Sequence, residues 1–229
     1  MNNRSPLKTE TFNILRERGV PVGTIIDVGI LNGTPELIST WPDKKHILFE
    51  PVEEFSQIIQ TAYSNVDHEL HHSAVSDSSG SVGLELRSVI QGMPISHSGM
   101  TEYGTGVDDR IVRQVPMIAL DDFLRDKEYA EPFLLKIDID GHELKVLRGA
   151  QKTLAKCSIV IVECPKIQLV ERISAVQTAG FILFDLCEPC YYDKAFWQCD
   201  GVFLRSDLHK KYFSQLTSNV DKEKYETFR

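Results

Sequence analysis

Short apolar runs alternate along this chain with segments of helical periodicity, and the alternation limits the fold more than any other sequence feature. Strand-sized runs occupy residues 24–29, 46–50, 69–75, 133–138, 158–163, 181–186 and 201–205. Between two of these runs, a helix is predicted by the spacing of Leu144, Leu147, Ala150 and Leu154. Strands and helices in alternation form βαβ units, and strands that are apolar throughout suit a sheet covered on both faces. The sequence therefore predicts an α/β fold with a doubly wound, mostly parallel sheet.

The length of 229 residues suits one large domain, since domains average roughly 150 residues. We predict a single domain over residues 1–229, with a helical lead-in at 1–23 and a tail at 206–229. Residues 76–116 are rich in Ser, Gly, Asp and Thr, and residues 88–114 within them show no sustained period. A segment this long without regular elements predicts a substrate loop or lid, and a surface insertion is an equal alternative.

The charge balance and the cysteine content exclude several classes of protein. Lys and Arg number 25 against 33 Asp and Glu, a formal net charge of −8, so a nucleic-acid partner is not expected. No apolar run approaches the roughly 18 residues of a membrane span, and the first residues lack the apolar core of a secretory signal. Five cysteines are too few for a disulfide scaffold and lack the regular spacing of a zinc site. We expect a cytoplasmic protein, and nothing in the sequence indicates its oligomeric state.

The first predicted strand ends in a glycine-bearing turn, at the sheet edge where open α/β sheets bind their ligands. Asp27 places a carboxylate beside Gly29 and Gly33, and Glu50 ends the next strand, where an acidic group can accept hydrogen bonds from a ribose. The turn has neither the G-x-G-x-x-G spacing of a dinucleotide site nor a phosphate-binding loop. Carboxylates repel a pyrophosphate but suit a cationic cofactor. These residues therefore favour S-adenosylmethionine, which carries an ammonium and a sulfonium, over NAD.

Five segments of the chain follow a known pattern: IIDVGxxxGT at 25–34, LFEP at 48–51, SAVSDSSG at 73–80, VPMIALDDFL at 115–124 and LLKIDIDGHELKVLRGA at 134–150. The last segment matches K-I-D-x-[ED]-G-x-E-x-x-V-L-x-G-A at every fixed position. Over residues 24–205 the chain therefore resembles the FkbM family of S-adenosylmethionine-dependent methyltransferases. The resemblance implies a Rossmann-like class I methyltransferase fold. It also implies methyl transfer, usually to a hydroxyl oxygen of a sugar or another natural product.

The resemblance further implies which residues bind the cofactor: Asp27, Gly29, Asn32, Gly33, Thr34, Glu50, Pro51, Ser73, Ala74 and Asp138. Among these, Glu50 would hold the ribose hydroxyls, and Ser73 and Ala74 would lie near the adenine. The family usually has an Ala-Asn pair in the glycine turn, whereas this chain has Ile30-Leu31, with Asn32 one place late. That departure keeps a non-catalytic binding module on the same fold as an alternative. An NAD-linked oxidoreductase is a weaker one, because the dinucleotide motif is missing.

Several ionisable groups fall where the strand at 133–138 meets the following helix. Asp138 ends that strand at the ligand edge and is the predicted catalytic residue, because methyl transfer needs a group that orients a hydroxyl or takes its proton. His142 is the second candidate base, since an imidazole accepts a proton near neutral pH. Asp140 and Glu143 have the spacing of a capping box and are predicted to support the helix. Lys136 is expected to face a helix-covered side of the sheet or to pair with a carboxylate.

The acceptor is predicted to be a small molecule or a carbohydrate, bound by residues from two regions. His97, Ser98, Met100 and Tyr103 lie in the segment 88–114, and Glu163 ends the strand at 158–163. Asp138 and Glu163 could together bind Mg²⁺ through oxygen ligands, but we favour a site without a metal. Aromatic residues at 191–197 are candidates either for the pocket wall or for the core.

Overall fold

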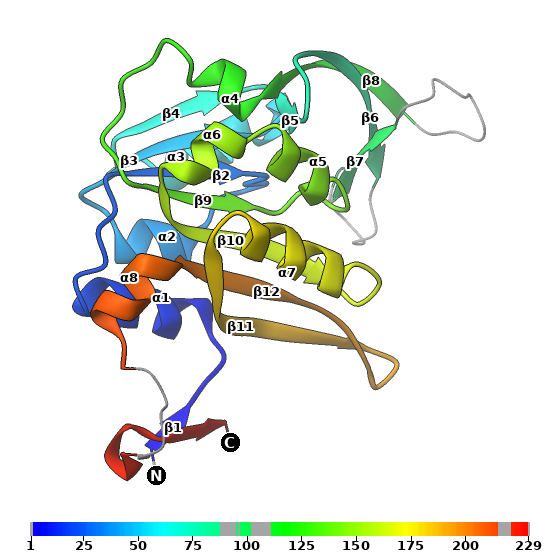
Figure 1. Cartoon of the computed structure of the whole chain (residues 1–229). Helices are drawn as coiled ribbons and strands as arrows, with labels where there is room; N and C mark the ends of the chain where they lie inside the picture. Colours follow the sequence, from blue (N-terminus) through cyan, green and yellow to red (C-terminus); the bar gives the residue numbers. More distant parts are fainter. Residues whose placement is uncertain (1, 88–94, 96, 102–110, 215–220, 229) are drawn as a thin grey trace.

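A seven-stranded sheet in the order β11-β12-β10-β9-β2-β3-β4 forms the centre of the molecule (Figure 1). The computed structural model describes residues 2–87, 95, 97–101, 111–214 and 221–228. The strands of the main sheet are β2 (Thr24–Val28), β3 (Lys45–Phe49), β4 (His68–His71), β9 (Phe133–Ile137), β10 (Cys157–Pro165), β11 (Phe181–Tyr192) and β12 (Ala195–Arg205). All share one direction except β12, which runs antiparallel to both of its neighbours. The predicted doubly wound, mostly parallel α/β fold is confirmed.

The order of the strands reverses beside β2. The chain passes from β2 to β3 and β4 on one side, and then returns to β9 and β10 on the other. In an open α/β sheet such a reversal leaves a crevice at the carboxyl ends of the strands, where ligands bind. Every residue of β2 and β9 is buried, as expected for strands covered on both faces. The crevice therefore has a rigid floor.

Helices cover both faces of the main sheet. One face carries α1 (Lys8–Glu17), α2 (Pro35–Thr40) and α8 (Ser206–Tyr212), whose buried side chains form one core cluster with β2, β9, β10 and β12. The opposite face carries α4 (Leu120–Phe123), α5 (Glu143–Arg148), α6 (Gln151–Ala155) and α7 (Leu169–Thr178), with a second core cluster beneath them. A short segment of 3-10 helix, η1 (Glu53–Phe55), leads into α3 (Ser56–Ala62), which packs against β3.

The prediction of a single helix between β9 and β10 is wrong, because the chain forms two helices there, α5 and α6, which are separated at Gly149. A Cβ atom at Gly149 would lie 2.3 Å from the carbonyl oxygen of Ser76, so the two backbones touch there. The Asp121 carboxylate then accepts hydrogen bonds from the N–H groups of Lys152 and Thr153, at 2.9 and 2.8 Å, and starts α6. The apolar spacing continues across the break, so periodicity alone does not reveal it.

A second, four-stranded sheet stands beside the main one, in the order β5-β8-β6-β7. Its strands are β5 (Ala74–Ser76), β6 (Gly80–Arg87), β7 (His97–Thr101) and β8 (Ile111–Ala119). The strand predicted at 69–75 is therefore two strands, β4 and β5, in different sheets. β7 and the start of β8 fall within 88–114, so the prediction that this segment lacks regular elements is wrong for those residues. β6 is additional to the predicted strands, although Val82, Leu84 and Leu86 alternate along it with other residues.

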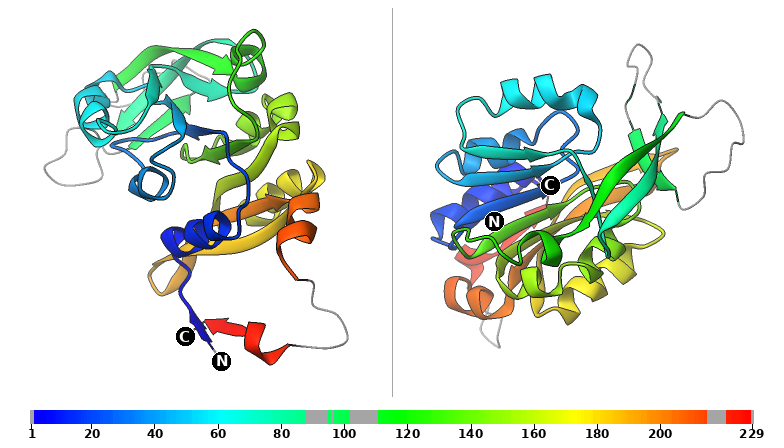
Figure 2. Two further views of the ribbon diagram at one scale, coloured as in Figure 1. Left: turned by 90° about the vertical axis from the view of Figure 1, so that its left-hand side faces the viewer. Right: turned by 90° about the horizontal axis from the view of Figure 1, so that it is seen from above.

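The two ends of the chain meet on the far side of the main sheet from the second sheet (Figures 1 and 2). β1 (Asn2–Arg4) and β13 (Glu226–Phe228) pair in parallel, and η2 (Lys222–Lys224) precedes β13. α1 lies within the segment 1–23, for which a helical lead-in is predicted. In the described part of the chain, no helix has both the length and the apolar character needed to cross a bilayer.

Candidate functional site

A pocket opens at the carboxyl ends of β2, β3 and β9, against the second sheet. Loop residues that follow these strands form its floor, and β5, β6 and β7 contribute one wall. Six residues predicted to bind the cofactor line it: Gly29, Glu50, Pro51, Ser73, Ala74 and Asp138. The other lining residues are Val28, Leu31, Phe49, Val75, Leu84, Met100, Ile139 and Asp140. Residues far apart in the sequence therefore meet at the crevice where the strand order reverses.

Glu50 is the most enclosed ionisable group in this lining, with 4% of its surface exposed. Its Oε2 accepts a hydrogen bond from the Leu31 N–H at 2.9 Å, and its Oε1 accepts one from the Val52 N–H, also at 2.9 Å. Burial raises the pKa of this carboxyl group to about 7, and the two backbone donors partly offset that rise. Each carboxylate oxygen can accept more than one hydrogen bond. Glu50 is thus oriented by the backbone and keeps capacity to accept bonds from a ligand.

The glycine turn after β2 is set by a close approach of two loops. Gly29 has φ +80°, and a Cβ atom there would lie only 1.9 Å from the carbonyl oxygen of Asp138. Ile30 is 3% exposed and packs beneath the turn, in a cluster with Leu48 and Tyr63. Leu31 has φ +49° and lines the pocket, where its N–H reaches Glu50. The two bulky residues that depart from the family pattern are therefore accommodated, one inward and one at the pocket.

Asp27 lies beneath the pocket and does not line it. The side chain is fully buried, its Oδ2 lies 3.4 Å from the hydroxyl of Tyr63, and its Oδ1 lies 3.4 Å from Nζ of Lys136. The hydroxyl of Tyr63 also accepts the Thr34 N–H at 3.3 Å. Thr34 is buried at the start of α2, and Asn32 is exposed, so both stand outside the lining, as does Gly33. Their roles in cofactor binding stay predictions.

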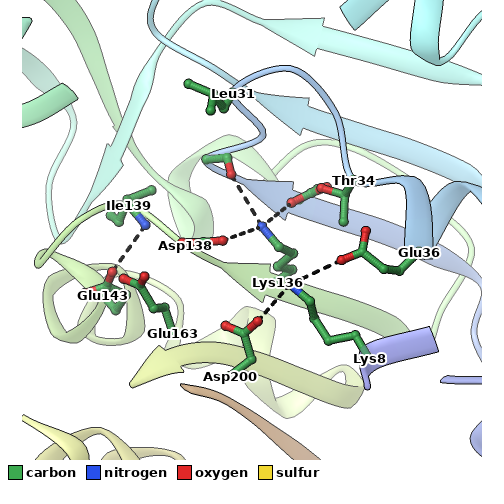
Figure 3. Close-up of polar contacts among 12 residues, drawn as sticks. Lys8, Leu31, Thr34, Glu36, Lys136, Asp138, Ile139, Glu143, Glu163 and Asp200 are labelled. Atoms are coloured by element: carbon green, nitrogen blue, oxygen red, sulfur yellow. Dashed lines mark hydrogen bonds and ion pairs between the residues drawn. The ribbon is translucent and has the colours of Figure 1, made fainter. Parts of the chain in front are cut away.

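Lys136 joins the buried and the open parts of the site (Figure 3). Its Nζ lies 3.2 Å from Oδ2 of Asp138 and 3.4 Å from the carbonyl oxygen of Gly29, in addition to its contact with Asp27. Asp138 is 36% exposed through its side chain and faces the pocket. The predicted pairing of Lys136 with a carboxylate is confirmed, and it involves two carboxylates instead of one.

Further acidic groups follow the neighbouring strands on the same face of the sheet. Glu163, on β10, is 9% exposed, and its Oε1 accepts a hydrogen bond from Nε2 of Gln198 at 2.6 Å. Burial, together with the nearby charge of Asp138, raises the pKa of Glu163 to about 8. With this raised pKa, Glu163 is largely protonated at neutral pH. On the neighbouring strand β12, Asp200 lies opposite Glu163 and 2.8 Å from Nζ of Lys8, and burial raises the pKa of Asp200 as well.

The predicted capping box at α5 is wrong for Asp140 and correct in part for Glu143. α5 begins at Glu143 with His142 in the capping position, whereas Asp140 is exposed two residues earlier, with φ +53°. Glu143 does reach back, because its Oε1 accepts the N–H groups of Ile139 and Gly141, each at 3.2 Å. Its Oε2 lies 2.5 Å from the Arg172 guanidinium, and both side chains are fully buried. Glu143 therefore links the loop between β9 and α5 to α7, through its hydrogen bonds and its ion pair with Arg172.

The remaining predicted residues lie to one side of the pocket or outside the described side chains. Nε2 of His142 lies 3.1 Å from the carbonyl oxygen of Met100, and the ring faces a neighbouring cavity bounded by α5 and the second sheet. The backbone of His97 and Ser98 belongs to β7, where it pairs with β6. Their side chains lie outside the described part of the structure, as does all of Tyr103. Among the described residues, no group of three or more His, Cys, Asp or Glu is arranged to hold a metal ion.

Sequence reasoning did not single out Gln198, Asp200 or Tyr63, and it left the partner of Lys136 open. One signal for Lys136 was present, since alternation along β9 puts Lys136 and Asp138 on one face, and the register pairs Lys136 with Asp27. Gln198 and Asp200 depend on the pairing of β12 with β10, which no local pattern reveals. Leu84 comes from the second sheet, whose position is likewise a tertiary property, whereas Met100 is among the predicted substrate-binding residues and does line the pocket.

A family model described as the methyltransferase FkbM domain matches residues 27–182, which is well over half of the chain. Among solved structures, the FkbM methyltransferase from Methylobacillus flagellatus KT aligns with a TM-score of 0.53 and 14% identity, over 80% of this chain and 43% of its own. The matched part of this chain thus spans less than half of that protein. No curated protein matches it.

Two further solved structures align over most of the chain with lower scores. A precorrin-6y C5,15-methyltransferase from Geobacter metallireducens GS-15 gives a TM-score of 0.47 and 8% identity, over 90% of this chain and 94% of its own. A magnesium protoporphyrin IX methyltransferase from Synechocystis PCC 6803, solved with bound SAM, gives a TM-score of 0.47 and 9% identity, over 86% of this chain and 79% of its own. The strand order, the pocket at its reversal and the family match agree. The fold is the Rossmann-like class I methyltransferase fold, and the chain belongs to the FkbM methyltransferase family.

Proposed function

We propose that this chain transfers a methyl group from S-adenosylmethionine to a hydroxyl oxygen of a sugar or a glycosylated small molecule. The observation that carries the proposal is Glu50, a buried carboxylate held by two backbone donors at the pocket formed where the strand order reverses. A carboxylate at this place in an α/β sheet accepts hydrogen bonds from ribose hydroxyls. The FkbM match supports methyl transfer as the reaction.

The residues that line the pocket suit the cofactor in charge and in polarity. Glu50 would accept the ribose hydroxyls, and Ser73 and Ala74 would lie beside the adenine, with Leu84 and Met100 as apolar neighbours. Asp138 supplies a carboxylate for the cationic end. A pyrophosphate would meet these carboxylates unfavourably, which argues against NAD.

When bound, S-adenosylmethionine would supply an electrophilic methyl group, whose bond to sulfur would break, with its electron pair left on sulfur, as the acceptor oxygen bonds to the methyl carbon. The chain must therefore orient the hydroxyl, exclude water and accept its proton. We assign the proton to a carboxylate oxygen of Asp138, which ends β9 at the pocket. Glu163, largely protonated at neutral pH, would donate a hydrogen bond to another acceptor oxygen.

Mg²⁺ held by Asp138 and Glu163 stays the less favoured alternative to a metal-free site. Asp138 already pairs with Lys136, and Glu163 accepts a bond from Gln198, so both carboxylates have protein partners. Methyl transfer should therefore proceed at the same rate with excess chelator and with added Mg²⁺.

Titration calorimetry with S-adenosylmethionine, its demethylated product and NAD tests the cofactor assignment. Binding of the first two at one site per chain, without NAD binding, is expected. Binding of NAD alone would indicate an oxidoreductase, and binding of none would indicate a module without this chemistry, so either result overturns the proposal. The acceptor is then sought by transfer of isotope-labelled methyl groups to a panel of hydroxyl-bearing glycosides.

A further inference from the structure

The ammonium group of Lys136 contacts three separate parts of the site from below. Its Nζ lies 3.4 Å from Oδ1 of Asp27 on β2, 3.2 Å from Oδ2 of Asp138 after β9, and 3.4 Å from the carbonyl oxygen of Gly29 in the glycine turn. The side chain is only 5% exposed. Figure 3 shows the ammonium between the glycine turn and Asp138, with the second lysine, Lys8, below it.

Burial at this position is costly for a lysine unless carboxylates surround it, because removing an ammonium from water disfavours its charged form. The carboxylates do surround it here: Asp138 and Asp27 raise the pKa of Lys136 above its ordinary value, Asp200 adds to that rise, and Lys8 opposes it. Lys136 therefore remains charged over the whole physiological range. A neutral side chain in its place would leave the fully buried Asp27 without a cation and the Asp138 side chain without its anchor.

A comparison with Lys8 separates a structural ion pair from one that acts on the pocket. Lys8 is also nearly buried, and its Nζ lies within 3.2 Å of three carboxylates, those of Glu36, Glu188 and Asp200. None of these three lines the pocket, whereas Asp138 and Gly29 both do. The two lysines have similar surroundings but only Lys136 touches the lining.

We propose that Lys136 is a positioning residue for this site, which fixes the Asp138 carboxylate and the Gly29 turn in the arrangement that binds the cofactor. The inference rests on the proposed function, because it concerns the same pocket. It goes beyond that function in giving a role to a residue that does not touch the pocket itself. Lys136 acts through Asp138 and through the turn, so its removal and that of Asp138 should affect the same step.

The test measures the affinity of the demethylated cofactor product by calorimetry, in the full chain. Lys136→Met should weaken binding at least 10-fold, the loss expected when charge-assisted hydrogen bonds are removed. Lys136→Arg retains the charge and should remain within about 3-fold of the parent protein, and so should the control Lys8→Met. If Lys136→Met does not fold, as judged by circular dichroism and thermal unfolding, Lys136→Gln takes its place with the same expectation.

A double variant provides the readout that a purely structural role would not move. If Lys136 acts through Asp138, then Lys136→Met should weaken binding much less in an Asp138→Asn background than in the parent protein. Independent losses that multiply in the double variant would overturn the inference. So would a folded Lys136→Met protein with unchanged affinity, or an equal loss in Lys8→Met. A parent protein that binds no cofactor product would instead overturn the proposed function, and with it this inference.

Discussion

Glu50 is buried by the fold and then supported by two backbone donors, and this combination is costly unless the site uses it. An exposed carboxylate would avoid the desolvation that raises the pKa of Glu50 to about 7. The donors, from Leu31 and Val52, fix both oxygens and leave each with capacity for a further bond. The sequence predicts a ligand-binding role for Glu50, because the residue directly follows a strand at the ligand edge of the sheet. The contacts of Lys136 depend on how β2, the glycine turn and the end of β9 come together, which the position of a residue in the sequence does not reveal.

Glu50→Ala should weaken the binding of S-adenosylmethionine about 10- to 150-fold, because it removes the charged acceptor for buried ribose hydroxyls, worth about 1.5–3 kcal/mol. Calorimetry on the folded variant measures the change. Glu53→Ala, three residues along the chain and exposed, is the matched control and should bind as the parent does. Equal affinity in the two variants would contradict the role of Glu50.

Asp138→Asn should lower turnover by about 10²- to 10⁴-fold, since the amide keeps the shape of the carboxylate but cannot take the proton of the acceptor. Transfer of labelled methyl groups measures turnover, and thermal unfolding should show a nearly unchanged stability. Asp140→Asn is the control, two residues away and more exposed. A reversal of the two results would move the proton acceptor to Asp140.

Glu163 gives a pH dependence of stability whose sign follows from its raised pKa. The carboxyl group has a pKa of about 8 in the folded protein and an ordinary value of 4.5, so the folded state binds more protons between these two values. Its contribution is full below about pH 4.5 and is lost as the pH rises to about 8. Glu163→Gln removes this loss, and its stability relative to the parent should rise by on the order of 4 kcal/mol between pH 5 and 8.5. Urea unfolding at both pH values measures the free energy of unfolding of the variant and the parent. The exposed Glu171→Gln is the control and should show no such pH dependence relative to the parent, and the same absence in Glu163→Gln would contradict the prediction.

At the scale of elements, the strands of the main sheet are predictable and the helices that follow them are less so. β2, β3, β9 and β10 are apolar runs between turns, and the structure confirms them within a few residues. α5 and α6 read as one helix because their apolar stripe is continuous, and only the contact of Gly149 with Ser76 separates them. Asp140 and Glu143 have the spacing of a capping box, but the partner that decides their roles, Arg172, lies on α7. Local pattern predicts which segments are regular, whereas tertiary contacts decide where they end.

Glu143→Ala should destabilise the protein by about 3–5 kcal/mol, because it leaves the fully buried Arg172 without its carboxylate and frees two loop N–H groups. Chemical denaturation measures the loss. Glu143→Gln can still accept hydrogen bonds from the two loop N–H groups and should lose less stability than Glu143→Ala. Glu171→Ala, an exposed acidic residue in the first turn of α7, should change stability by less than about 0.5 kcal/mol. A small loss in Glu143→Ala would show that the ion pair does not join α5 to α7.

At the scale of the whole molecule, the site lies between two sheets, and only one of them is predictable. The rhythm of the main sheet indicates a doubly wound fold, and the rule for strand reversals locates the crevice. The second sheet depends on the pairing of β5 with β8 and of β6 with both β7 and β8, which no local pattern in the sequence reveals. Leu84 and Met100 from this sheet complete the pocket wall. The prediction that residues 88–114 serve as a lid stays a prediction, because most of that segment lies outside the described residues.

Cofactor binding should therefore stabilise the second sheet, because a ligand in the pocket would contact the main sheet on one side and β6 and β7 on the other. Amide hydrogen exchange in β6 and β7 should slow by at least several-fold when the demethylated cofactor product is added, since opening of these strands would have to break contacts with the ligand. The β11–β12 hairpin is the internal control, because it belongs to the main sheet but does not line the pocket. Equal slowing in both regions would indicate a global gain in stability, and no slowing in β6 and β7 would place the ligand away from the second sheet. Slowing confined to the second sheet and to the loops of the pocket is the result that the shared wall requires.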